Sequence, residues 1–308
     1  MKFDLISVGA SLIDLVASVD RFPSSDDETY VPNLRIEYGG SAANTAVACS
    51  RLGLKVAFLG KVGVDFFGDM IVKKFREEGV DTSLILRAES TPTGLCFIAV
   101  DSKGDRRMFA YSGAANNLSV SEVKLDSLLQ TRLLYMASLE NVKFLSDLSR
   151  KVKEHGLKTA LNPGALIANQ GLAKAKPIIM NTDIYVSSYN EAVRIFGVEG
   201  LDNIKNVLFQ LGVSTIAITL GAEGCMVADK SETYMIPAIK VEVKDTTGAG
   251  DAFTAGFLTG LLNNKNLFEA GYMGVAAAAL KVKYMGARGG LPYLEELEKF
   301  IKSHSIKR

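Results

Sequence analysis

The sequence predicts an α/β protein with a mainly parallel central sheet, helices on both of its faces, and a small additional β-sheet. Short apolar runs alternate with helical stretches through most of the chain, and several helical stretches end at a glycine. Such alternation favours a parallel sheet that is covered on both faces. Residues 14–38 and 92–111 instead contain strands and turns without a helix between them, which predicts the additional sheet.

The expected elements follow one another in order. Short buried strands are expected at 4–11, 55–63, 132–138, 158–164, 183–188 and 215–221. Helices are expected at 41–53, 65–79, 142–156 and 203–212, and then at roughly 249–263, 268–284 and 292–302. Gly79, Gly156 and Gly212 stand where a helix commonly ends on a glycine. The tetrapeptide SKGD, residues 102–105, predicts a hairpin turn in the additional sheet.

Composition and charge exclude several classes of function. The chain has 308 residues, of which 48% are hydrophobic and 22% charged, as in globular proteins with a large core. Its 35 basic and 34 acidic residues give a net charge of +1, so nothing indicates binding to nucleic acid or to an anionic membrane. The apolar runs are too short to span a membrane, and the amino-terminal stretch lacks the apolar core of a signal peptide.

The cysteines and histidines limit the chemistry. Cys49, Cys96 and Cys225 form neither a CxxC pair nor a disulfide framework, so we expect a reducing cytoplasm. Only two histidines are present, His155 at an expected helix end and His304 in a polar tail. A histidine base, a catalytic triad and a zinc site are therefore disfavoured. The reaction must use carboxylates, backbone amides and hydroxyls.

The segment DTTGAGDAF, residues 245–253, comes directly before an expected helix. Gly248, Ala249 and Gly250 would lie at its amino terminus, where free backbone amides and the helix dipole favour an anion such as phosphate. Asp251 follows in the first turn, well placed to accept a proton from an incoming hydroxyl. The alternative is purely structural, with Asp251 favouring the helix start and the glycines permitting close packing.

A second glycine-rich segment is YGGSAANTAVACSRLG, residues 38–53. Gly39 and Gly40 precede an expected helix that carries Asn44 on its first turn. This arrangement suits close packing of a polyhydroxylated ligand, although a simple turn capped by Asn44 explains it as well. The chain lacks the P-loop pattern GxxxxGK[ST], and its first strand lacks the GxGxxG of a dinucleotide-binding unit.

Together these segments resemble the ribokinase family of carbohydrate kinases, which includes adenosine kinase and the minor phosphofructokinases. GGSAANTA resembles the amino-terminal signature of the family, and DTTGAGDAFTAG fits its carboxy-terminal signature closely. ISVGASLID, ITLGAEG and AAAALKVKYMGARGGLP extend the likeness over nearly the whole chain. The resemblance implies a single domain over residues 1–308 with a Rossmann-like α/β body, in which the segments 14–38 and 92–111 form a β-sheet lid.

The resemblance also assigns catalytic and substrate-binding roles. Asp251 would be the general base, and the amides of Gly248, Ala249 and Gly250 would stabilise charge on the transferred γ-phosphoryl group. The residues that match positions binding the substrate's hydroxyls are Asp14, Gly39, Gly40, Asn44 and Glu140. Asp14 at a strand end and Glu140 at a helix start also have ordinary structural explanations, and the residues alone leave these open.

For the phosphoryl donor the resemblance implies ATP and Mg²⁺. Thr219, Gly221 and Gly224 match the turn that lies beside ATP. Glu191 matches a glutamate that organises Mg²⁺, which we expect to act through water because Mg²⁺ keeps much of its hydration. Ser188 stands where the family often has an asparagine, so the full metal-organising motif is not retained.

A monovalent cation is implied as well. Asp245, Thr247 and the loop from Gly286 to Gly290 resemble the cation site of family members that potassium activates. A carboxylate and turn carbonyls beside an anion hole can hold such an ion, while ordinary loop structure is the alternative.

We therefore expect an ATP-dependent kinase that phosphorylates a hydroxymethyl group of a ribose-like sugar. A nucleoside kinase is the nearest alternative, because Phe97, Phe109 and Tyr111 could form a slot for a base. Arg106 and Arg107 could bind a phosphorylated or acidic sugar if the lid turns them inward. An oxidoreductase and a non-catalytic sugar- or nucleotide-binding module are more distant alternatives. Expected partners are the small-molecule substrates and, through the lid edges, a second copy of the chain.

Overall fold

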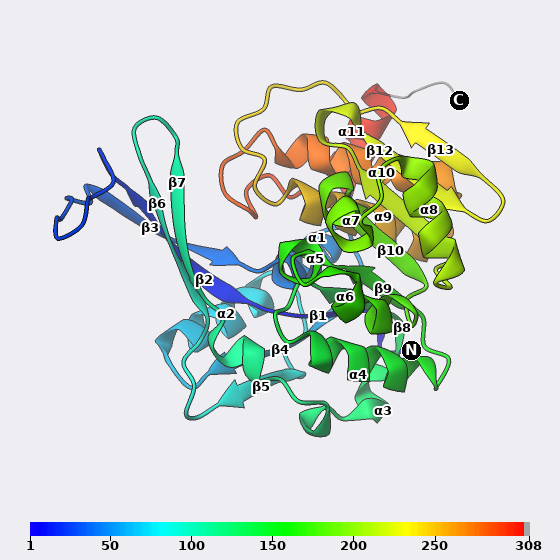
Figure 1. Cartoon of the computed structure of the whole chain (residues 1–308), viewed down its shortest axis with the longest axis horizontal. Helices are drawn as coiled ribbons and strands as arrows, with labels where there is room; N and C mark the ends of the chain where they lie inside the picture. Colours follow the sequence, from blue (N-terminus) through cyan, green and yellow to red (C-terminus); the bar gives the residue numbers. More distant parts are fainter. Residues whose placement is uncertain (305–308) are drawn as a thin grey trace.

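The computed structural model describes residues 1–304 and contains a central nine-stranded sheet with helices on both faces (Figure 1). The strand order is β13-β12-β11-β10-β9-β8-β1-β4-β5. The strands are β1 (Phe3–Val8), β4 (Val56–Gly63), β5 (Ile85–Ala88), β8 (Thr131–Ala137), β9 (Thr159–Asn162), β10 (Ile184–Ser188), β11 (Thr215–Thr219), β12 (Cys225–Asp229) and β13 (Thr233–Ile236). All neighbours from β5 to β11 pair in parallel, while β12 and β13 add an antiparallel hairpin. The predicted fold class is confirmed.

Two hydrophobic cores lie on the two faces of this sheet. One core is covered by α1 (Ser41–Arg51), α2 (Phe66–Glu77), α9 (Ala249–Leu262), α10 (Leu267–Lys281) and α11 (Leu294–Ser303). The other is covered by α3 (Leu125–Leu128), α4 (Val142–Lys153), α5 (Gly164–Ala168), α6 (Gly171–Ile179), α7 (Tyr189–Phe196) and α8 (Leu201–Gln210). Because side chains alternate along a strand, neighbours such as Leu5 and Ile6 of β1 enter opposite cores. Both faces are therefore apolar, as expected for a covered parallel sheet.

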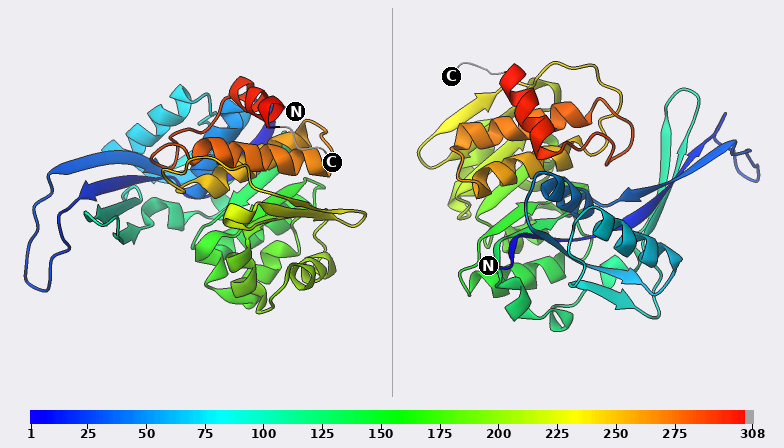
Figure 2. Two further views of the ribbon diagram at one scale, coloured as in Figure 1. Left: turned by 90° about the horizontal axis from the view of Figure 1, so that it is seen from above. Right: turned by 180° about the vertical axis from the view of Figure 1, so that it is seen from behind.

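A separate four-stranded sheet projects from one side of this body (Figures 1 and 2). We call it the lid sheet; it consists of β2 (Leu12–Ser18), β3 (Asn33–Gly39), β6 (Leu95–Val100) and β7 (Arg106–Tyr111) in the order β3-β2-β6-β7. These strands come from the two segments that lacked helices in the sequence. The predicted turn at 102–105 joins the antiparallel strands β6 and β7.

The strand register gives the lid sheet two chemically different faces. Ser18 lies four residues after Asp14 on β2, so both side chains are on the same face of the sheet. Ser18 pairs with Val100 of β6, and Val100 pairs with Arg106 of β7. Asp14 and Arg106 therefore share one face, which we call the inner face. Leu15 pairs with Phe97, which pairs with Phe109, so Phe97, Phe109 and Tyr111 lie on the opposite, outer face.

Several elements were missing from the sequence prediction. Strand β5 is only four residues long, and the β12–β13 hairpin directly follows another apolar strand, so neither has a distinct pattern. Helix α6 contains Pro177, which disfavours a helix by sequence alone. The predicted glycine stops hold: Gly79, Gly156 and Gly212 follow α2, α4 and α8 with positive φ. Within residues 1–304 no helix is both long and apolar enough to cross a membrane.

Candidate active site

The candidate site lies at the carboxyl edge of the central sheet. The parallel strands β1, β8, β10 and β11 end there at Val8, Ala137, Ser188 and Thr219. Ligands of open α/β sheets bind at this edge. Helices α1 and α9 pack against each other, and the first turn of each contributes to one cluster of polar side chains.

Asp251 is the centre of that cluster. It lies in the first turn of α9, directly after the Gly248–Gly250 segment, and Gly248 has a left-handed φ of 79°. Ser41 Oγ donates to Asp251 Oδ1 at 2.6 Å, and Asn44 Nδ2 donates to Oδ2 at 2.9 Å. Both donors belong to the first turn of α1. The two helix starts thereby fix the carboxylate beside the backbone amides at the beginning of α9, among which the amide of Ala249 donates to the carbonyl oxygen of Thr246 at 3.1 Å.

The surroundings of Asp251 act on its pKa in opposite directions. Burial raises the pKa of Asp251, the hydrogen bonds from Ser41 and Asn44 lower it, and the net shift is upward. The nearby positive charge of Arg288 lowers the pKa and the negative charge of Glu191 raises it. A carboxylate with a raised pKa is a better proton acceptor, provided that it stays ionised at the working pH.

Asn44 connects Asp251 to a buried arginine. Arg288 Nε donates to Asn44 Oδ1 at 2.9 Å, so the amide oxygen is occupied and its nitrogen must point to Asp251. The Arg288 guanidinium lies over the rings of Tyr38 and Phe75, and burial lowers its pKa to about 10. Arg288 therefore sets the orientation of Asn44, and through it that of the carboxylate.

Asp14, another predicted hydroxyl-binding residue, lies next to Gly39. Its carboxylate lies against the backbone of Gly39, where a Cβ would stand 2.5 Å from Asp14 Oδ2. Gly40 has φ 99°, and a Cβ there would stand 2.3 Å from the carbonyl oxygen of Ala10. Burial and the negative charge of Glu37 raise the pKa of Asp14 to about 6. Gly39 thus makes room for the Asp14 carboxylate, and Gly40 allows the backbone of Ala10 to approach the start of α1.

Glu140 lies at another part of this edge, after β8. Ser112 Oγ and Asn116 Nδ2 donate to its Oε2 at 3.1 and 3.2 Å. Both donors come from the segment that leads out of β7, so Glu140 joins the base of the lid sheet to the body. It also borders a shallow hollow of about 320 Å³ together with Asn141 and Gln170. Its two donors, Ser112 and Asn116, differ from the side chains that bond to Asn44, which are Asp251 and Arg288.

The residues predicted for the nucleotide lie at the end of β11 and in the turn that follows. Thr219 ends the strand, and its hydroxyl points to the carbonyl oxygen of Ser187 at 3.4 Å. Gly221 and Gly224 have φ of 61° and 104°. A Cβ on Gly224 would stand 2.0 Å from the carbonyl oxygen of Ile236, so only glycine fits there.

Glu191 has a structural role at the start of α7. Ser188 and Glu191 form a reciprocal capping box, in which the amide of Ser188 donates to Glu191 Oε2 at 2.9 Å. The Ser188 amide bonds to only one of the two carboxylate oxygens of Glu191. The negative charge of this carboxylate is close enough to Asp251 to raise the pKa of Asp251. In residues 1–304 no three His, Cys, Asp or Glu side chains form a metal cluster. A single carboxylate is nevertheless sufficient for an Mg²⁺ that is held mainly by phosphates and water.

Asp245 is fixed on both sides of its carboxylate. Thr247 donates to Oδ1 through its amide and its hydroxyl at 2.9 and 2.7 Å, and the amide of Gly286 donates to Oδ2 at 2.8 Å. Burial favours the neutral acid, yet these hydrogen bonds outweigh it and hold the pKa of Asp245 at about 2. Arg106 of the lid sheet reaches the same group, with Nη2 3.6 Å from Asp245 Oδ1.

Three residues near the site were not predicted from the sequence as site residues. Ser41 stands inside GGSAANTA and Arg288 inside the loop from Gly286 to Gly290, but neither side chain was given a role. Lys281 is fully buried at the end of α10, and its Nζ donates to the carbonyl oxygen of Asp245 at 2.9 Å. A lysine inside the apolar run AAAALKV was a usable signal, because lysine is almost never buried without a partner.

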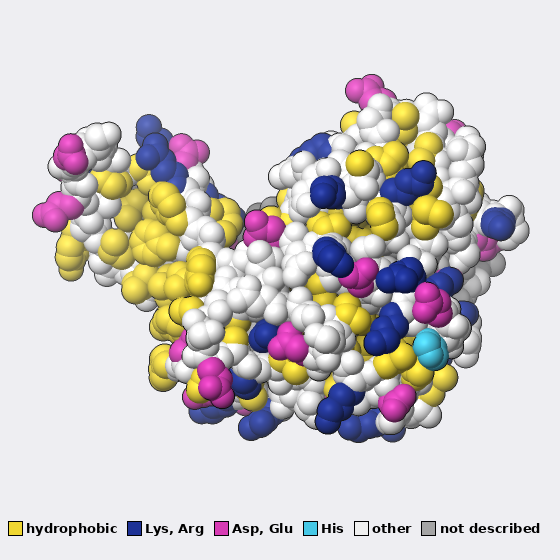
Figure 3. All heavy atoms as spheres, turned by 60° about the horizontal axis from the view of Figure 1, so that its bottom comes forward, with side chains coloured by type: hydrophobic (Ala, Val, Ile, Leu, Met, Phe, Trp, Pro, Cys, Tyr) yellow, Lys and Arg dark blue, Asp and Glu magenta, His cyan; other side chains and the backbone are white. Residues whose placement is uncertain are grey.

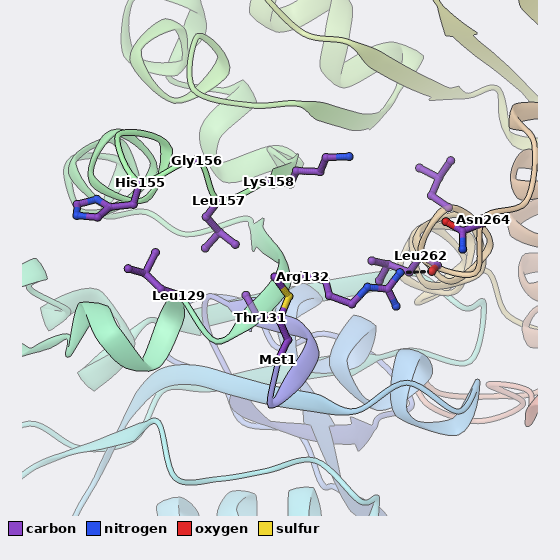
Figure 4. Close-up of a pocket in the computed structure, with 11 residues that line it drawn as sticks. Met1, Leu129, Thr131, Arg132, His155, Gly156, Leu157, Lys158, Leu262 and Asn264 are labelled. Carbon is purple, nitrogen blue, oxygen red and sulfur yellow. Dashed lines mark hydrogen bonds between the residues drawn. The ribbon is translucent and has the colours of Figure 1, made fainter.

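A larger hollow, about 570 Å³, lies at the opposite edge of the sheet (Figure 4). It is lined by Met1, Thr131 and Lys158, which stand at or before the amino ends of β1, β8 and β9. Arg132 crosses it to the carbonyl oxygen of Leu262 at the end of α9. Because the polar cluster around Asp251 lies at the other edge, this hollow is not part of the site.

Known proteins resemble this chain over nearly its whole length. The sequence pattern of the pfkB family carbohydrate kinases matches residues 2–294. The chain belongs to this family. It is 34% identical to the ribokinase of Haemophilus influenzae, over 98% of this chain and 99% of that protein. It is 29% identical to a nucleoside kinase of Methanothermobacter thermautotrophicus, over 94% of this chain and 92% of that protein.

A solved structure confirms the fold. The Arabidopsis thaliana ribokinase, determined with ribose and ATP, superposes with a TM-score of 0.88 over 98% of this chain and 99% of that one, at 23% identity. The resemblance inferred from GGSAANTA and DTTGAGDAFTAG is therefore correct. This pfkB family member is a carbohydrate kinase, a phosphotransferase.

Proposed function

We propose that this kinase transfers the γ-phosphoryl group of ATP to a hydroxymethyl group of a small, ribose-like sugar. The observation that carries the proposal is the position of Asp251. Its carboxylate follows the glycine-rich start of α9 and is oriented by Ser41 and Asn44 from the start of α1. A proton acceptor thus stands beside a site that suits a phosphate.

Asp251 acts as the general base in this proposal. The pKa of a carboxylic acid is far below that of an alcohol, so Asp251 cannot remove the proton before the reaction begins. Phosphoryl transfer passes through a loose transition state, in which the hydroxyl becomes acidic late. A positioned carboxylate then suffices, and the raised pKa of Asp251 increases its basicity.

The amides of Gly248, Ala249 and Gly250 serve as the anion hole. They stand at the start of a 14-residue helix, where backbone N–H groups and the helix dipole favour negative charge. Stabilising the charge on the phosphoryl oxygens and aligning the two substrates contribute most of the acceleration. The glycines let the phosphate approach the backbone closely.

The nucleotide would lie along the end of β11 and its turn, at Thr219, Gly221 and Gly224. Glu191, whose Oε2 caps α7, would organise Mg²⁺ through water, because Mg²⁺ keeps much of its hydration. When bound, Mg²⁺ neutralises charge on the phosphates. The protein would contribute the carboxylate of Glu191, which lies close enough to Asp251 at the start of α9 to raise its pKa.

The acceptor would be held by Asp14, Asn44 and Glu140, with Gly39 and Gly40 allowing it to approach the backbone. Several polar groups on one side suit a polyol. The lid register supports a sugar over a nucleoside, because Phe97, Phe109 and Tyr111 share the outer face, opposite to Asp14. The aromatic slot considered for a base would thus lie on the wrong side of the sheet.

The lid sheet supports two further parts of the proposal. Its outer face exposes Leu34, Ile36, Phe109 and Tyr111, and apolar side chains gather visibly over this sheet (Figure 3). Exposed apolar surface of this kind is typical of a protein contact, so we propose a homodimer formed through the lid. All three cysteines are free and buried, which fits the expected reducing compartment.

The test is a coupled assay of ADP release with pentoses, hexoses, their phosphates and nucleosides as acceptors. We expect a free pentose to give the highest kcat/KM. Faster turnover of nucleosides than of every free sugar would contradict the sugar assignment and leave the kinase intact. Faster turnover of a phosphorylated sugar would instead assign Arg106, which lies on the inner face, to the acceptor.

A further inference from the structure

Lys281 is an unusual residue for its position. It ends α10, is fully buried, and lies among apolar neighbours of the helix. Its ammonium group donates to the carbonyl oxygens of Asp245 and Tyr284 at 2.9 and 3.3 Å. Burying a charge is costly unless it is paired, so a lysine here needs a specific reason.

The two acceptors of Lys281 belong to the loops on either side of the anion hole. Asp245 begins the segment that leads to Gly248, and Tyr284 begins the loop that ends at Gly290. These loops touch directly: a Cβ on Gly248 would stand 2.4 Å from the carbonyl oxygen of Ala287. The amide of Gly286 also donates to Asp245 Oδ2. A cation that binds both loops therefore controls where the amides of the anion hole stand.

We propose that Lys281 serves as a built-in monovalent cation that holds the anion hole in place, so that the kinase does not require potassium. The ammonium group resembles potassium in charge and size, and it contacts carbonyl oxygens as a bound potassium ion would. The potassium site predicted from the resemblance at Asp245 and Thr247 lies at these same loops. Lys281 is a positioning residue in this proposal, since it acts on the phosphoryl group only through the backbone of residues 245–250.

The surrounding charges support a cation that is already present. Asp245, Asp251 and Glu37 are the acidic groups that act on Lys281, and Arg106 is the basic one. Arg106 lies on the other side of Asp245, 3.6 Å from Oδ1, and its Nη1 donates to Thr247 Oγ1. Asp245 thus contacts two tethered cations, Lys281 at its backbone carbonyl oxygen and Arg106 near its carboxylate. A further mobile cation would meet repulsion from both.

The first experiment measures the wild-type enzyme in chloride salts of potassium, sodium and tetramethylammonium at equal ionic strength, with the best acceptor from the panel. We expect the same kcat in all three salts. A several-fold activation by potassium would overturn the proposal. The measurement rests on the kinase activity proposed above, but the outcomes differ: a wrong acceptor gives no turnover in any salt.

The second experiment compares Lys281→Ala with Lys281→Met. In tetramethylammonium we expect each to lower kcat by about 10- to 100-fold, the loss typical of a misplaced catalytic group. Potassium should restore Lys281→Ala, in which the carbonyl oxygens are open to an ion. It should not restore Lys281→Met, whose side chain still fills the space. Lys283→Ala, two residues away on the same segment, is the control and should behave like the wild type.

Thermal unfolding gives a readout that does not depend on the acceptor. Potassium should raise the Tm of Lys281→Ala more than tetramethylammonium does, and should leave the wild-type Tm unchanged. If Lys281 only stabilised the fold, the variants would lose Tm without any potassium-specific recovery of Tm or kcat. That result, or full activity of Lys281→Ala without potassium, would overturn the proposal.

Discussion

The segment from Asp245 to Asp251 and the lid sheet differ in how firmly their side chains are held. In the first, each carboxylate has specified donors: Thr247 and Gly286 for Asp245, Ser41 and Asn44 for Asp251. In the lid sheet, by contrast, every residue of β7 is exposed. The segment from Asp245 to Asp251 is thus held by specific hydrogen bonds, two of them from α1, whereas the lid sheet presents an exposed strand.

The same comparison applies to three aspartates at the site. Hydrogen bonds hold the pKa of Asp245 at about 2, while burial raises that of Asp14 to about 6 and raises that of Asp251. Residue type is constant, so the environment sets the role. Asp245 is an anion at neutral pH and suited to structure, whereas Asp14, with a pKa of about 6, can change protonation state within an accessible pH range.

The largest effect is expected when Asp251, the proposed general base, is replaced. Asp251→Asn keeps the shape and removes the proton acceptor, so kcat should fall by at least ~10²-fold, the usual contribution of general base catalysis. Binding of ATP, measured by calorimetry, should change little. Ser41→Ala removes only one donor to Asp251 and should cause a much smaller loss. Near-normal turnover of Asp251→Asn would remove the assignment.

A smaller effect is expected where the body meets the lid. Glu140→Gln keeps the hydrogen-bonding shape but loses the charge, so KM for a sugar acceptor should rise by about 10-fold, as for a lost charge-assisted hydrogen bond. The value of kcat should stay close to that of the wild type. Glu154→Gln, an exposed glutamate at the end of α4, is the matched control. An unchanged KM in Glu140→Gln would make Glu140 purely structural.

The sequence predicted most of the segment from Asp245 to Asp251 and less of the lid sheet. Gly248, Gly250 and Asp251 are neighbours in the chain, so the role proposed for them could be inferred from one short motif. Ser41 and Lys281 reach this motif from elements 210 and 36 residues away, and no local pattern shows such contacts. The faces of the lid depend on pairing register between strands, which a list of strands does not contain.

The contribution of Asp14 to stability should depend on pH. Its pKa of about 6 lies above the ~3.9 expected in the unfolded chain. The folded state therefore holds the proton more tightly, and the stability gained from protonated Asp14 is lost as the pH rises through about 6. Asp14→Asn should raise Tm at pH 8 and have no such effect at pH 3, as measured by thermal unfolding.

The titration of Asp14 should also appear in the kinetics, where the ionised form is the favourable one. If ionised Asp14 accepts a hydrogen bond from the sugar, kcat/KM should fall as the pH decreases below about 6. Asp14→Asn should lower kcat/KM several-fold at neutral pH and remove this part of the profile. A variant that is more stable yet binds sugar normally would separate Asp14 from the acceptor.

The smallest effect on turnover is expected on the outer face of the lid. Phe109 and Met108 are neighbours on β7, are 66% and 62% exposed, and point to opposite faces. Phe109→Ser should shift a lid-mediated dimer towards monomer in analytical ultracentrifugation while leaving kcat nearly unchanged. Met108→Ser, on the inner face with Asp14, should leave the oligomeric state intact and change KM for the acceptor. If both variants behave alike in both measurements, the two faces do not divide these tasks, and the lid register carries no functional distinction.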